Sequence, residues 1–149
     1  MKVPGHLQRW PTSAARQALA ARFGLPYDKQ MQDWEWEVAH PSLFPAFLAA
    51  YACGDLDDDE RFSLMECLVQ SVADIPTPPG GGPPSEWDAV AELLRAAPQR
   101  HASTIAYWSR MTGEEGWEWA GVGEAMRQVW AEVQGQLAEP TAAPDPARM

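Results

Sequence analysis

The residues best placed by type and spacing to do chemistry lie in one acidic stretch, 55–66. Four of its carboxylates stand at the first, third, fifth and twelfth positions, which are occupied by Asp55, Asp57, Asp59 and Glu66. These are ligand positions of a calcium-binding EF-hand loop, whose twelfth residue is a bidentate glutamate. The sixth position is Glu60, however, where the sharp turn of that loop requires glycine. The stretch therefore matches only part of the calcium motif.

The same stretch is also typical of a helix start. Asp57 suits an N-cap, and Glu60 three residues later completes a capping box. Asp58 and Asp59 would lie in the first turn, where negative charge is favourable. A helix over 57–73 would carry Glu66 away from the aspartates. We therefore expect a capped helix with no bound calcium and no other cofactor.

Other patterns that could carry catalysis are incomplete. Glu37 and His40 form one Glu-x-x-His pair, whereas a di-iron bundle needs two pairs and two further glutamates. Cys53 and Cys67 form no Cys-x-x-Cys pair and have no zinc-site spacing. The sequence contains no G-x-S-x-G, P-loop or G-x-G-x-x-G motif. His101 shares a helical face with apolar residues, so we expect a hydrogen-bonded core histidine. No enzyme class is indicated.

The tripeptide Trp-Glu-Trp occurs twice, with Trp34 and Trp36 in the first copy and Trp117 and Trp119 in the second. On a helix, positions i and i+2 point apart, so both tryptophans of a pair cannot be buried on one face. We expect at least one of each pair to be partly exposed beside acidic residues. Such aromatics are candidate anchors for a protein partner.

The charge of the chain favours a basic partner. The 149 residues carry a net charge of −10. Residues 1–30 hold five bases and one acid, whereas residues 31–74 hold ten acids and only Arg61. An acidic field repels the phosphates of nucleic acids and attracts basic proteins. We expect no direct binding of nucleic acid.

Composition also bears on the compartment. No run approaches the roughly 18 apolar residues that span a bilayer, and no apolar segment typical of a secretory signal follows Lys2. Only two cysteines occur. We expect a cytoplasmic protein without membrane contact. The stretch 1–27 is acid-free, which also suits an organellar transit peptide, but we favour a first helix docked on an acidic body.

Hydrophobic periodicity predicts an all-α fold of about seven short helices. The expected helices cover about 12–24, 28–39, 42–54, 57–73, a segment that begins at Ser85, 98–113 and 122–137. The segment 34–38 also alternates like a short strand. We expect a single helical domain over 1–139, with an irregular basic arm at 1–11, a Pro/Gly loop at 75–84 and a disordered tail at 140–149. The pattern leaves open a compact bundle or stacked antiparallel helix pairs.

These observations favour a non-enzymatic, acidic protein-binding domain. Its most specific version is a cytosolic inhibitor or immunity protein for a basic toxin or nuclease. The expected contacts are Trp34, Trp36, Trp117 and Trp119 as anchors, with Asp55, Asp57, Asp58, Asp59 and Glu60 steering the encounter. The alternatives are a structural or adaptor subunit of a larger assembly, and an enzyme with an unrecognised site.

Overall fold

A computed structural model describes residues 2–78, 80–110 and 120–137. Within these ranges the chain forms seven α-helices, two short 3₁₀ helices and no strand, which confirms the all-α prediction. The α-helices are α1 (Ser13–Phe23), α2 (Trp34–Val38), α3 (Phe44–Ala52), α4 (Asp58–Ala73), α5 (Trp87–Ala96), α6 (Ala102–Ser109) and α7 (Ala120–Leu137). The 3₁₀ helices are η1 (Gly5–Leu7) and η2 (Pro41–Leu43).

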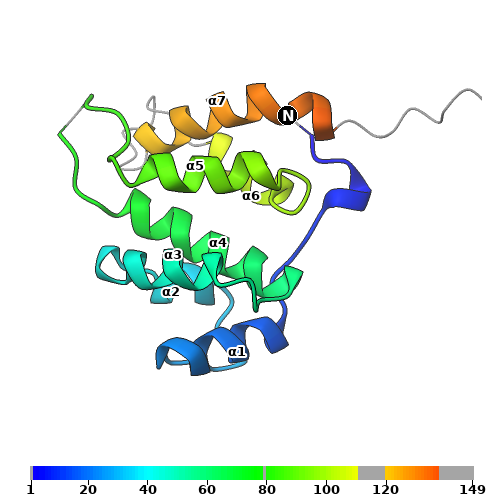
Figure 1. Cartoon of the computed structure of the whole chain (residues 1–149), viewed down its shortest axis with the longest axis vertical. Coiled ribbons are helices and arrows are strands. Elements are labelled where there is room, and N and C mark those ends of the chain that lie inside the picture. Colours follow the sequence, from blue (N-terminus) through cyan, green and yellow to red (C-terminus); the bar gives the residue numbers. More distant parts are fainter. Residues whose placement is uncertain (1, 79, 111–119, 138–149) are drawn as a thin grey trace, which may run out of the picture.

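Helix α4 occupies the centre of the molecule. Eleven of its 16 residues are buried, because helices pack against it from two sides. Figure 1 shows α1, α2 and α3 on one side of α4, and α5, α6 and α7 on the other. Helix α7 lies against both α5 and α6. The helices thus form two groups of three around one buried helix.

The predicted capping box at the start of α4 is present. The Asp57 carboxylate accepts a hydrogen bond from the Glu60 backbone N–H at 2.8 Å. The Glu60 carboxylate in turn accepts one from the Asp57 N–H at 3.1 Å. Each bond satisfies a backbone donor that a helix start leaves free. The acidic stretch therefore begins a helix, as predicted.

The second helix begins later than predicted, at Trp34. Asp28 does not cap a helix; its carboxylate accepts a hydrogen bond from the Gln30 N–H at 2.9 Å, and its carbonyl accepts one from the Met31 N–H. This local turn competes with helix initiation, as short acidic side chains often do. The segment 34–38 is helical, so the alternating pattern did not indicate a strand.

Two other predicted caps are not used. Ser42 lies within η2, and its N–H donates to Nδ1 of His40 at 3.0 Å, so α3 begins only at Phe44. Ser85 lies in a turn before α5, and no side chain caps that helix. In both places the predicted cap lies within a turn that begins at a proline, Pro41 or Pro84, and the helix starts after that turn.

The buried side chains form one continuous hydrophobic cluster that runs from the N-terminal arm to α7. Trp34 and Trp108 are the largest side chains that are completely buried. Residues 76–78 and 80–84 have no helix or strand, in agreement with the predicted loop. The predicted tail and the second Trp-Glu-Trp copy lie outside the described residues. None of the described helices is both long enough and apolar enough to cross a membrane.

Candidate functional site

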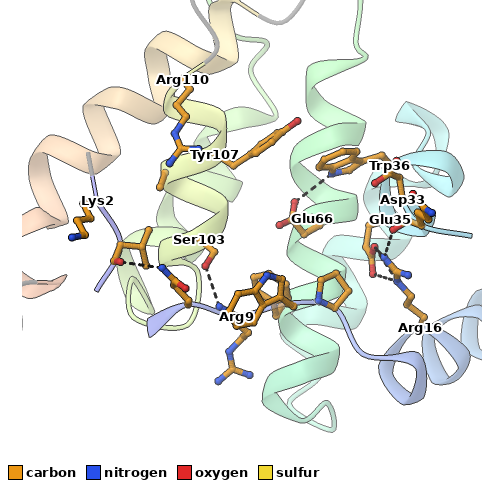
Figure 2. A pocket seen from close by; sticks show the side chains of 17 residues that line it. Lys2, Arg9, Arg16, Asp33, Glu35, Trp36, Glu66, Ser103, Tyr107 and Arg110 are labelled. Carbon is orange, nitrogen blue, oxygen red and sulfur yellow. Dashed lines mark hydrogen bonds and ion pairs between the residues drawn. The ribbon is translucent and has the colours of Figure 1, made fainter. Parts of the chain in front are cut away.

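A pocket with a volume of about 450 Å³ lies where α2, α4 and α6 meet the N-terminal arm. We define this arm as residues 2–11. Figure 2 shows how side chains from all four segments converge there. Its lining includes Arg9, Trp10, Trp36, Glu66, Ser103 and Tyr107.

The arm forms one wall because two contacts hold Arg9. Its backbone N–H donates to the hydroxyl of Ser103 on α6 at 3.1 Å. Its guanidinium forms an ion pair with Asp59, at the start of α4, at 2.9 Å. Val3 is buried in the hydrophobic cluster. The predicted arm is therefore attached to the body of the protein, and it includes η1.

Two aromatic rings form a second wall of the pocket. Trp36 from α2 stacks on Tyr107 from α6, with ring centroids 5.2 Å apart and an interplanar angle of 29°. Trp34 is completely buried, and its indole N–H donates to the Pro26 carbonyl at 2.7 Å. Trp36 is only partly buried. The prediction that one tryptophan of this pair is partly exposed is thus confirmed.

Among the described residues, Trp10 and Tyr107 are the large hydrophobic side chains that remain exposed, at 69% and 38%. Both line the pocket. Neither residue could be singled out from the sequence, because Trp10 lies in a segment without periodicity and Tyr107 lies off the apolar face of its helix. The only available signal was an isolated tryptophan beside Pro11 in a polar arm.

Glu66 of α4 borders the pocket and is held by two neutral donors. The Thr104 hydroxyl donates to one carboxylate oxygen at 2.9 Å, and the Trp36 indole N–H donates to the other at 3.4 Å. Burial raises the pKa of Glu66 to about 7, the nearby Glu35 charge adds to this rise, and the two hydrogen bonds oppose it. Glu66 entered the sequence reasoning only as a possible calcium ligand, so its place in this pocket was missed.

Beside Glu66 lies an ion pair between the partly buried Arg16 of α1 and the buried Glu35 of α2. The guanidinium contacts both carboxylate oxygens, with Nε 2.9 Å from Oε2 and Nη2 2.7 Å from Oε1. Arg16 also donates to the carbonyls of Met31 and Gln32. Glu35 is only 2% exposed. This pair joins α1 to α2 at the edge of the pocket, and each charge is compensated by the other.

The structure places the acids of residues 55–60 at the start of α4, outside the pocket lining. Three of them form ion pairs with arginines: Asp55 with Arg22, Asp58 with Arg100, and Asp59 with Arg9. Asp57 and Glu60 form the capping box. Much of the local negative charge is therefore compensated within the protein.

The four carboxylates of the partial calcium motif have separate environments. Asp55 and Asp59 face arginines, Asp57 caps α4, and Glu66 lies about two turns along that helix beside Trp36. In the part of the chain that the structure describes, no three His, Cys, Asp or Glu side chains are arranged to hold a metal ion. The spacing in the sequence suggested that these four carboxylates lie close together. Formation of α4 separates them instead.

Comparisons of the chain with protein-family models, curated proteins and solved structures gave no significant match. Functional inference therefore depends on the pocket and on the charge of the chain.

Proposed function

We propose that this chain is a non-enzymatic protein-binding domain that engages a basic partner at the pocket. The observation that carries the proposal is the gathering of exposed aromatic surface at one place. Trp10 and Tyr107 flank the pocket, and Trp36 lies between Tyr107 and Glu66. Tryptophan and tyrosine are common anchors in protein interfaces. An inhibitor or immunity protein for a basic toxin or nuclease is the most specific version of this proposal.

Charge supports a basic partner, but the structure changes which acids we expect to steer it. Asp58 and Asp59 each have an arginine partner. Asp33, just before α2, and Glu37, within α2, are exposed near Trp36. Neither forms an ion pair with any described residue. Uncompensated charges at the rim of an interface mainly raise the association rate. We therefore place the steering on Asp33 and Glu37 together with the overall charge of −10.

The proposal is tested by affinity capture from the native host, followed by binding kinetics with the captured protein. Trp10→Ala is the best first variant, because its exposed side chain contributes little to folding. We expect the dissociation rate to rise roughly tenfold or more, as for the loss of an interface anchor. Gln128→Ala, on the exposed side of α7, is the matched control and should leave both rates unchanged.

Charge reversal supplies a second readout with a different kinetic signature. Replacing Asp33 and Glu37 by lysine should lower the association rate, and the effect should shrink at high salt because ions screen exposed charges. Reversal of Asp58 should have a smaller effect, since Asp58 already faces Arg100. An acidic partner, or binding that does not respond to salt or to Trp10→Ala, would contradict the proposal and leave an adaptor role.

One observation favours a second candidate, an enzyme. A carboxylic acid with a pKa near 7 in a pocket is suited to general acid–base catalysis. This candidate requires a substrate whose turnover depends on a group of pKa near 7 and is abolished by Glu66→Gln. A partner protein that binds at the pocket without being modified would argue against it.

A further inference from the structure

The charges that line the pocket differ in whether they already have a partner. Arg16 and Glu35 form a two-point ion pair with each other, and Arg9 is paired with Asp59. Glu66 receives hydrogen bonds only from the uncharged Thr104 and Trp36. Among the described residues no lysine, arginine or histidine lies within ion-pair distance of it. Glu66 is therefore the inner carboxylate of the pocket whose charge is not compensated.

The surroundings of Glu66 are suited to a flat or apolar group that carries positive charge. Trp36 and Tyr107 stack beside it, Phe62 lies one turn before it on α4, and Trp10 lines the same pocket. Aromatic rings attract ammonium and guanidinium groups through their electron-rich faces, and they also contact the apolar stem of a lysine or arginine side chain. A carboxylate among such rings provides the opposite charge.

We infer that the pocket binds a cationic side chain, an ammonium or guanidinium group, which packs against Trp10, Trp36 and Tyr107 and forms an ion pair with Glu66. The inference rests on the proposed function and deepens it, because it names the group by which a basic partner would enter the pocket. Lys2 and Arg110 are exposed at the pocket lining. They can face the backbone carbonyls of the partner, while the inserted cation reaches Glu66.

An anionic ligand could contact Lys2 and Arg110 in this pocket, but it would also meet Glu66. Two of the four basic side chains that line the pocket, Arg9 and Arg16, are already bound to acids of this chain. An anion at the aromatic wall would lie next to Glu66 and would require that carboxyl to stay protonated. Binding of an anion should then strengthen as the pH falls, which is the opposite of the behaviour expected for a cation.

The pH dependence follows from the group that must ionise. Besides Glu66, the titratable and charged residues that line the pocket are Lys2, Arg9, Arg16, Asp33, Glu35, Tyr107 and Arg110. With a pKa of about 7, Glu66 is mostly protonated at pH 6 and mostly ionised at pH 8. A ligand that binds only the ionised form loses affinity in proportion to the ionised fraction. The apparent affinity for a cation should therefore fall about tenfold from pH 8 to pH 6.

The experiment is an NMR titration of the full chain with N-acetyl-lysine methylamide and N-acetyl-arginine methylamide. The indole N–H signal of Trp36 reports on the site because this group donates to Glu66, and Trp36→Phe identifies the signal. We expect saturable shifts for both cationic probes, weaker binding at pH 6, and little response to N-acetyl-norleucine methylamide. Glu66→Gln should reduce the affinity at pH 8 at least tenfold and remove its dependence on pH.

Glu92→Gln is the matched control, since it removes the same charge from an exposed position of α5 outside the pocket. It should leave the titration unchanged. If Glu66→Gln does not fold, the pH dependence of the unmodified protein still decides the question. Equal binding of the norleucine probe, tighter binding of N-acetyl-glutamate methylamide at low pH, or unchanged binding in Glu66→Gln would overturn the inference.

Failure of the inference and failure of the proposed function give different results. The titration uses small probes and needs no partner protein. If the probes do not bind but Trp10→Ala still weakens the captured partner, the inference is wrong and the proposed function stands. If the probes bind at Glu66 while the partner is insensitive to Trp10→Ala, the pocket recognises cations and the proposed protein interface is wrong.

Discussion

Tyr51 and His101 form a buried hydrogen bond, with 2.6 Å between the phenol oxygen and Nε2. The bond joins α3 to the residue that precedes α6. The Arg100 guanidinium donates to the same phenol oxygen at 3.4 Å. Burial lowers the pKa of His101 to about 3, and the positive charges of Arg100 and Arg9 add to the effect. His101 is therefore a neutral core residue, as predicted, although the predicted helix start at Pro98 is wrong: α6 begins at Ala102, after a turn that contains His101.

The first prediction is that His101 makes the fold sensitive to acid. Its pKa is about 6.5 in an unfolded chain and about 3 in the folded protein, so the unfolded state binds the additional proton between these values. Stability from this residue is present above pH 6.5 and is lost as the pH falls toward 3. His101→Gln should lower stability at pH 7 by about 1–3 kcal/mol through loss of the buried hydrogen bond.

The stability of the variant relative to the unmodified protein should also rise as the pH falls below 6.5, because glutamine does not titrate. Urea unfolding at pH 4, 5, 6 and 7 measures both effects, and the difference between variant and unmodified protein isolates the contribution of His101. His6→Gln, at an exposed position, is the control. A difference that stays constant over this pH range would show that His101 is not the acid-sensitive group.

The second prediction concerns the ion pair of Arg16 and Glu35. When one member of a buried pair is removed, the other remains as a buried charge without compensation, which typically costs about 3–5 kcal/mol. We expect Glu35→Gln to cost less than this range, about 1–2 kcal/mol, because Arg16 is only partly buried and keeps the carbonyls of Met31 and Gln32. The double variant Arg16→Met/Glu35→Leu should recover much of the loss.

Thermal and urea unfolding at neutral pH provide the measurement. The exposed pair of Arg22 and Asp55 is the comparison, since exposed pairs contribute little to stability, and Arg22→Met should have no measurable effect. If Glu35→Gln is as neutral as Arg22→Met, the buried pair does not stabilise the contact of α1 with α2.

How far the sequence predicted the structure depended on the range of the interactions involved. The α4 cap was predictable because Asp57 and Glu60 are three residues apart and satisfy each other locally. The late start of α2 was not predictable, because Asp28 is compatible both with a helix cap and with the turn that it forms. Burial of His101 followed from helical periodicity, whereas its partner Tyr51 is fifty residues away.

The pocket was harder to predict, because it is built from four segments that are distant in sequence. The rule that i and i+2 point apart on a helix predicted one partly exposed tryptophan, but it named Trp34 and Trp36 alike as anchors. The structure buries Trp34 completely, which rules it out as an anchor, and places Trp36 at the pocket. It grouped Glu66 with the aspartates before it, whereas α4 turns Glu66 toward Thr104, 38 residues later. Trp10 was missed because the arm has no periodicity. The contacts of its neighbour Arg9 with Asp59 and Ser103 bring this part of the arm to the pocket.

The third prediction compares two glycines in α7. Gly135 is exposed, and a Cβ atom there would meet nothing within 4 Å. Gly135→Ala should raise stability by about 0.5–1 kcal/mol, because alanine is a better helix former. At Gly121 a Cβ atom would lie 2.9 Å from the backbone of Gly82. The same substitution should therefore be destabilising there, because the 75–84 loop must shift. Thermal unfolding of both variants separates the two effects, and equal stabilisation would mean that Gly121 does not contact the loop.

The fourth prediction is that Glu66 gives stability a pH dependence opposite to that of His101. Its pKa is 4.5 in the unfolded reference and about 7 in the folded protein, so the folded state holds the extra proton between these values. Stability therefore falls as the pH rises from 4.5 to 7, and the loss remains at higher pH. Over the interval from 4.5 to 6.5 the two residues change stability in opposite directions, and their effects should largely cancel in the unmodified protein.

Glu66→Gln should remove the effect of Glu66, so that the variant gains stability relative to the unmodified protein by up to about 3 kcal/mol between pH 4.5 and pH 8. Urea unfolding across this range measures the gain, with Glu92→Gln as the control for loss of an exposed charge. A difference between Glu66→Gln and the unmodified protein that does not change with pH would mean that Glu66 is ionised in the folded state throughout, with a cation compensating its charge.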